Sequence, residues 1–227
     1  MWWLLLAMAA LGGTSGRKRG AELMSSATPP ISSGPGGAGV TSKIPPGAAR
    51  RWVWPLPRLA DGRAPRVSSG WGSPRGTGTP GAHSHVGVDV MYRRVVLLPE
   101  GTKLPLPDHG SRGFELPAGT PVLAASAGTV WSTGHTERGY SVTISHPGTG
   151  WATWYQHLET LAIPPHARGK LVSGGPPMQV GAGHVLGAAG WSKLDGHQVR
   201  HLHFEVRLGT APFDAQRMME TKWEVIS

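Results

Sequence analysis

The chain of 227 residues contains no cysteine. This absence excludes disulfide bridges, cysteine-ligated zinc, iron–sulfur clusters and a thiol nucleophile. Charged residues are also scarce, at 15%, and the acidic ones are the scarcer: 13 Asp and Glu face 22 Lys and Arg, which leaves a formal charge of +9. Such an excess of positive charge favours a polyanionic partner, either a nucleic acid or an anionic cell envelope.

The apolar run at the start of the chain, from Trp2 to Leu11, is short. A bilayer-spanning helix needs about 20 apolar residues, whereas the apolar part of an export signal needs only about 7–15. No basic residue precedes the run and Arg17-Lys18-Arg19 follows it, so a simple apolar tail or a misplaced start is the alternative. We expect residues 1–15 to form an export or anchor segment, and membrane contact only through it.

Glycine and proline are abundant, at 34 and 21 residues, about a quarter of the chain. This composition disfavours long helices and favours a loop-rich β protein. Residues 16–51 consist mainly of Ser, Thr, Pro, Gly and Ala, and bury too little apolar surface to offset the cost of ordering them. Large apolar residues return at Trp52. We therefore predict a disordered linker over 16–51 and a folded domain over 52–227.

Several stretches of the folded part have strand character. The predicted strands lie at 119–131 (two short strands), 140–146, 151–158 and 200–207. The turn sequence Pro147–Gly150 joins the middle two into a hairpin. The single helix candidate covers 212–221. The sequence therefore predicts an all-β fold: a mainly antiparallel sheet in one compact domain, with long loops and little helix.

Eleven histidines make histidine chemistry the first to consider. Two groupings stand out: His85 and Asp89 are four residues apart, and His201-Leu202-His203 places two histidines on one face of a strand. A catalytic zinc ion needs three nitrogen or oxygen ligands and one open position. A histidine, a carboxylate and a distant histidine supply such a set, although each grouping alone also occurs on ordinary surfaces.

Both groupings belong to a series of motifs whose order resembles that of the lysostaphin/LytM-type zinc endopeptidases. This β-lytic metallopeptidase family cuts the cross-bridges of bacterial peptidoglycan. The similar segments are Ser68–Gly72, Ser84–Val90, Gly119–Ala125 with Gly128–Val130, Trp154–Leu158 and His201–Glu205. They cover roughly Trp54 to Asp214. The resemblance implies a compact antiparallel β-sheet domain with its site in a groove lined by loops.

The resemblance also implies residue roles. His85, Asp89 and His203 match the zinc ligands, for one Zn²⁺ in the domain, and His157 and His201 match the two catalytic histidines that do not bind metal. The implied protein is an exported zinc metalloendopeptidase of the bacterial cell envelope. Its implied substrates are peptide cross-bridges or stem peptides of peptidoglycan. The charge of +9, independently of the resemblance, favours anionic wall polymers as further partners.

The remaining histidines, including His83, are expected to be structural or solvated, and Asp195 and Glu205 either orient a ligand histidine or are ordinary surface carboxylates. Two departures from the family leave the cleaved bond open: an inserted Pro-rich segment over 91–118 and a longer loop over 190–201. Two other classes compete with the enzyme. A non-catalytic relative that binds or activates another wall hydrolase would typically lack zinc ligands, and a nucleic-acid binder would carry a recognition motif, which this chain lacks.

Overall fold

The computed structural model describes residues 50–97, 103–105, 113–192 and 199–227. The predicted export segment and residues 16–49 of the predicted linker lie outside the described residues, as do His109, Asp195 and His197. Within the described part, no helix is long and apolar enough to cross a membrane.

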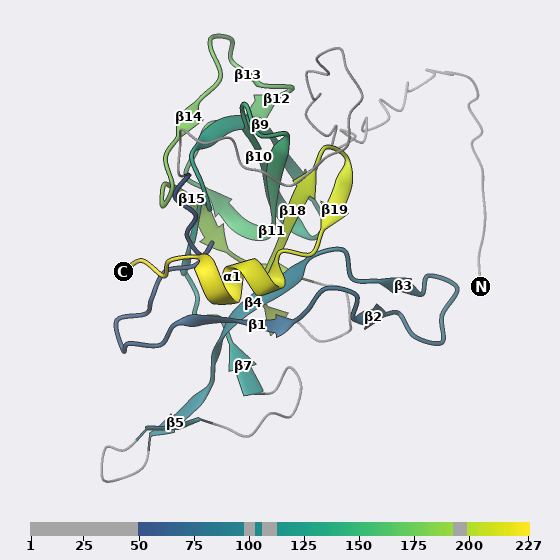
Figure 1. Cartoon of the computed structure of the whole chain (residues 1–227), viewed down its shortest axis with the longest axis vertical. Coiled ribbons are helices and arrows are strands. Elements are labelled where there is room, and N and C mark those ends of the chain that lie inside the picture. The colour runs from purple at the N-terminus through teal and green to yellow at the C-terminus, as the bar shows by residue number, and fades with distance from the viewer. Residues whose placement is uncertain (1–49, 98–102, 106–112, 193–198) are drawn as a thin grey trace, which may run out of the picture.

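One large sheet dominates the described residues (Figure 1). Its path runs through β1 (Pro65–Ser69), β4 (Val88–Arg93), β18 (Leu202–Leu208), β11 (Trp151–Leu161), β10 (Gly139–His146), β9 (Gly128–Thr136) and β14 (Gln179–Val180). Four strands join from the side: β15 (Val185–Ala189) on β11, β8 (Pro121–Leu123) on β15, β7 (Phe114–Glu115) on β4, and β19 (Ala211–Phe213) on β18. All of these strand pairs are antiparallel, which confirms the predicted fold class.

Four two-stranded pairs and one helix complete the described part of the fold. The pairs are β2 (Pro74–Arg75) with β3 (His83–Ser84), β5 (Val95–Leu97) with β6 (Lys103–Pro105), β12 (His166–Ala167) with β13 (Lys170–Leu171), and β16 (Trp191–Ser192) with β17 (Val199–Arg200). The helix α1 covers Gln216–Lys222. It begins later than predicted, because residues 211–213 pair with β18 as strand β19 instead.

The predicted hairpin around Pro147–Gly150 is present, as β10 paired with β11. Period-two burial explains these strands: Leu202, Phe204 and Val206 of β18 are buried on one face of the strand. They belong to a core that also holds Tyr155 of β11 and Met219 of α1. Burial of the apolar face of the sheet therefore stabilises the domain, and polar residues occupy the alternate positions of the same strands, on the opposite face.

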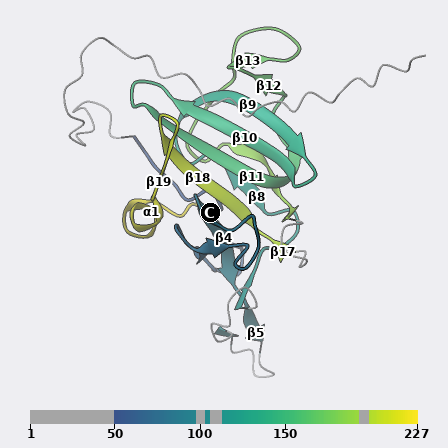
Figure 2. The same cartoon turned by 90° about the vertical axis from the view of Figure 1, so that its right-hand side faces the viewer.

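Three neighbouring strands, β4, β18 and β11, run through the middle of the sheet, with β18 between the other two (Figures 1 and 2). His203 of β18 lies opposite Asp89 of β4 on one side and opposite Gln156 of β11 on the other. Gly87 permits the close approach, because a Cβ there would come within 2.6 Å of the carbonyl oxygen of Phe204. The register thus brings together residues that are more than a hundred positions apart in sequence.

Candidate metal centre and active site

Three side chains meet where β4 and β18 adjoin. The Nε2 atom of His85 lies 2.9 Å from Nδ1 of His203, and Oδ1 of Asp89 lies 3.2 Å from that Nδ1 and 3.3 Å from His85 Nε2. His85 and Asp89 are buried, and His203 is partly buried. The structure thus places one nitrogen or oxygen atom from each of the three residues in a tight triangle.

The outer nitrogen of each histidine in this triangle faces an acceptor. Nδ1 of His85 lies 3.1 Å from the carbonyl oxygen of Gly70, and Nε2 of His203 lies 3.0 Å from Oε1 of Glu205. In a neutral imidazole the nitrogen that donates fixes the other as a lone pair. When the outer nitrogens carry the protons, the atoms that face one another are two lone-pair nitrogens and a carboxylate oxygen, a set that suits a cation; without a metal, a proton on His203 serves Asp89 instead.

The pKa values of the triangle reflect this demand for positive charge. Burial alone would lower the pKa of His203, but hydrogen bonds to Asp89 and Glu205 outweigh it and raise the pKa to about 9. Burial would likewise raise the pKa of Asp89, yet the hydrogen bonds from His203 and His85 hold it well below its usual range. The carboxylate therefore stays ionised, and the cluster attracts cations.

The separations fit a tetrahedral zinc ion. Zinc–nitrogen and zinc–oxygen bonds of about 2.0–2.1 Å imply ligand atoms roughly 3.3–3.4 Å apart, close to the distances in this triangle. Two imidazoles and one carboxylate are zinc ligands, and the outer hydrogen bonds are those that metal-binding histidines usually make. The residues present therefore fit the metal that the sequence implies.

His157 and His201 lie beside the triangle. Their rings are 4.8 Å apart between centroids, the ring of His157 lies 6.0 Å from that of His203, and Nε2 of His201 lies 3.7 Å from Oδ1 of Asp89. Each ring has its Nδ1 atom 3.1 Å from a backbone carbonyl oxygen, that of Arg138 for His157 and that of Val199 for His201. Both Nε2 atoms thus remain available for chemistry.

His157 owes its orientation to an irregularity in β11. Between Tyr155 and Leu158 this strand advances three residues while β10 advances two, which makes a β-bulge. His157 itself has φ of +66°, a strained value for a residue other than glycine. Burial, assisted by the charge of His201, lowers the pKa of His157 to about 4, so its ring is neutral at pH 7. Strain of this kind commonly marks a functional position.

Glu205 connects the triangle to the sheet behind it. The side chain is 3% exposed, and its second oxygen accepts a hydrogen bond of 2.8 Å from Nε of Arg207. Arg207 in turn lies over the ring of Trp154, 4.0 Å from its centroid. The pKa of Glu205 is lowered because the hydrogen bond from His203 outweighs the effect of burial. Of the two carboxylates named from the sequence, Glu205 therefore contacts a triangle histidine.

The other described histidines stay outside the site. His146 and His166 are buried and hydrogen-bonded to backbone and side-chain groups, and His83, His135 and His184 are exposed. Two residues that the sequence analysis did not single out contact the site: Arg75, close to His85 and Asp89, and Arg138, through its carbonyl oxygen. Nothing in the local sequence pattern distinguishes either arginine from the other basic residues.

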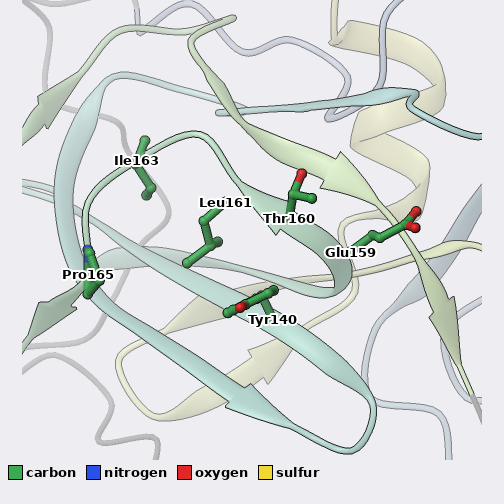
Figure 3. A pocket seen from close by; sticks show the side chains of 6 residues that line it. All are labelled: Tyr140, Glu159, Thr160, Leu161, Ile163 and Pro165. Atoms are coloured by element: carbon green, nitrogen blue, oxygen red, sulfur yellow. The ribbon is translucent and has the colours of Figure 1, made fainter.

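A separate hollow of about 410 Å³ lies near the end of β11. Figure 3 shows its lining, with Glu159 at one end, Pro165 at the other, and Tyr140 and Leu161 between them. Tyr140 pairs in register with Leu158, the residue after His157. The hollow is lined by none of the five predicted site residues.

Comparisons with known proteins agree with this fold. The model of peptidase family M23 matches residues 108–215, which include His157, His201 and His203 but not His85 and Asp89. No curated protein sequence matches the chain. A chain in the crystal structure of the SpoIIIAH–SpoIIQ complex has 16% identity and a TM-score of 0.51, covering 74% of this chain and 100% of its own length. The lysostaphin catalytic domain from Staphylococcus simulans has 21% identity and a TM-score of 0.44, with coverages of 67% and 90%.

These findings agree with the antiparallel β-sheet fold described above. Residues 108–215 therefore carry a peptidase family M23 domain, which supports the lysostaphin/LytM type that the motifs resemble.

Proposed function

We propose that the protein is a zinc metalloendopeptidase that hydrolyses peptide cross-bridges or stem peptides of bacterial peptidoglycan. The observation that carries the proposal is the triangle of His85, Asp89 and His203, whose facing atoms are 2.9–3.3 Å apart and suit a cation. These three residues would hold one Zn²⁺. When bound there, zinc supplies a Lewis acid that polarises a carbonyl group and makes water acidic enough to react near neutral pH.

The residues around the triangle would perform the proton transfers. With Nδ1 bonded to a backbone carbonyl, His157 and His201 would each present Nε2 to the reacting atoms. A neutral imidazole can take a proton from water at this atom, and an imidazolium can donate one to the leaving amine or stabilise an oxyanion. The lowered pKa of His157 keeps its ring in the neutral form, as proton acceptance requires. Glu205 would hold the ring of His203 in place.

The setting of this activity is also part of the proposal. A domain over residues 52–227 would act in the cell envelope, after export directed by residues 1–15. The formal charge of +9 would favour anionic wall polymers near the substrate. No nucleic-acid partner is proposed, because no recognition motif accompanies the charge.

Digestion of purified peptidoglycan tests the proposal. The full chain, loaded with zinc, should release muropeptides whose masses identify the bond cut, and the His203→Ala protein should release none. A protein that binds zinc and the wall but releases no fragment would instead support the alternative, a non-catalytic member that binds or activates another wall hydrolase. Structural likeness to a chain of the SpoIIIAH–SpoIIQ complex, a protein assembly, favours testing that alternative.

A further inference from the structure

Arg75 enters the triangle from the β2–β3 hairpin. One guanidinium nitrogen lies 3.0 Å and 3.2 Å from the two ring nitrogens of His85, and the same nitrogen forms an ion pair with Oδ2 of Asp89. The Arg75 side chain is 27% exposed, so most of it lies against the site. A positively charged group therefore contacts two of the three proposed ligands.

Arg75 and a metal ion would compete for the same atoms. A cation bound to His85 Nε2 and Asp89 would lie within a few ångströms of the guanidinium, and two positive charges at that distance repel each other strongly in a partly buried site. His85 Nε2 and the Asp89 carboxylate would also have to give up their contacts with the guanidinium in order to bind the metal ion. The guanidinium thus supplies in the metal-free protein the positive charge that the triangle needs.

The β2–β3 hairpin allows Arg75 to leave. Its two strands pair over only two residues each, and Gly76 and Gly78 follow Arg75 with positive φ. The base of the hairpin is held at the site, because the amide of His85 donates to the carbonyl oxygen of Ser73, with 2.9 Å between nitrogen and oxygen. Figure 1 shows the hairpin projecting from the ends of β1 and β4. The long arginine side chain can therefore swing away while His85 keeps its position.

We propose that Arg75 is an internal cation that occupies the metal centre of the metal-free protein and sets its affinity for zinc. The inference rests on the proposed function, since it requires the triangle to bind metal. Its consequence is reciprocal: whatever stability the Arg75 contacts give to the metal-free protein must be given up when zinc binds. Arg75 is thus a residue of the metal centre that lowers its affinity for zinc.

Zinc titration of the full chain against a chromophoric chelator tests this proposal. Replacement Arg75→Gln should tighten zinc binding about tenfold or more, which corresponds to about 1.4 kcal/mol. The matched control is Arg66→Gln, because Arg66 is an exposed arginine of β1 paired in register with Met91, two residues beyond Asp89. It removes the same charge nearby without touching the ligands, and should shift the affinity by less than about twofold.

Thermal unfolding gives an independent measure of the same coupling. Without zinc, the Arg75→Gln protein should melt at a lower temperature than the unmodified chain, and saturating zinc should abolish the difference. Arg75→Met, which keeps an apolar stem in place, must show the same tightening should the glutamine variant fail to fold.

The outcomes separate the two proposals. Zinc binding that is unchanged or weaker in both Arg75 variants overturns the role of Arg75 and leaves the metallopeptidase proposal standing. Absence of zinc binding in the unmodified chain and in every variant overturns the metal centre itself, and the role of Arg75 with it.

Discussion

Two histidines of the same sheet, the buried His146 and the partly buried His203, have pKa values shifted in opposite directions. His146 is 1% exposed, and its two ring nitrogens meet the carbonyl oxygen of Ala127 at 2.9 Å and the hydroxyl of Thr153 at 3.0 Å. Burial lowers its pKa to about 4. His203 faces two carboxylates, which raise its pKa to about 9 despite burial. Burial alone therefore does not identify a proposed metal ligand; the two carboxylates that face His203 distinguish it from His146.

The largest expected effect is a difference between alanine variants of the proposed zinc ligands and alanine variants of the proposed catalytic histidines. Alanine at His85, Asp89 or His203 removes one of three ligands, so bound zinc, measured by elemental analysis, and peptidoglycan hydrolysis should both be lost. Alanine at His157 or His201 should leave zinc bound and slow hydrolysis by roughly 10²–10⁴, the usual contribution of a positioned acid or base. Alanine at His146 is the structural control and should change neither beyond its effect on folding.

A His201→Ala protein that is purified free of zinc would refute this division, and so would a His203→Ala protein that retains full zinc.

The second prediction concerns the pH dependence of stability that arises from His146. The unfolded chain takes up a proton at this residue near pH 6.5, whereas the folded chain does so only near pH 4. The unfolded state therefore binds more protons between these values, and the contribution of His146 is fully present above about pH 6.5 and is lost as pH falls toward 4. The loss should reach roughly 3 kcal/mol.

Urea unfolding of the His146→Gln protein over this pH range checks the second prediction. The variant should lack that part of the pH slope, while the part due to His157, whose pKa is also lowered to about 4, remains. An identical slope in both proteins would mean that His146 is not held neutral by burial.

The third prediction concerns the contribution of Glu205, the carboxylate behind His203, to zinc affinity. Glu205→Gln keeps the shape of the side chain but removes the charge that faces Nε2 of His203 and Arg207. Loss of a carboxylate behind a ligand histidine typically weakens metal binding by about 10–100-fold. Chelator competition should detect this loss, whereas Glu159→Gln, at an exposed carboxylate paired with Arg200, should leave zinc affinity unchanged. Equal affinities in the two variants would show that Glu205 serves only to pair Arg207.

Local sequence pattern sufficed for the central strands and for the resemblance that named five site residues. The period-two alternation of residues 200–207 predicts His201 and His203 on one face. In the structure both lie at the site, although His201 stands between β17 and β18 and not within a strand. The helix was misplaced at its start because residues 211–213 are drawn into the sheet by β18, a pairing that no local pattern shows. The sequence does not single out Arg75, because only the fold brings its guanidinium to Asp89.

The smallest expected effects come from two glycine turns, one beside His157 and one beside His146. Gly139 has φ of +96° and lies next to the bulge at His157, where a Cβ would come within 2.6 Å of the carbonyl oxygen of Leu158. Gly148 has φ of +76° two residues after His146, with no atom within 4 Å of such a Cβ. Alanine at either position incurs the strain of positive φ, about 1 kcal/mol. Gly139→Ala must also displace β11, and with it the hydrogen bond between Nδ1 of His157 and the carbonyl oxygen of Arg138. We therefore expect Gly148→Ala to lower stability by about 1 kcal/mol in urea unfolding with full hydrolytic activity, and Gly139→Ala to cost roughly 1–2 kcal/mol more and reduce hydrolysis while zinc stays bound. Equal stability and equal activity in the two proteins would mean that the turn at Gly139 does not position His157.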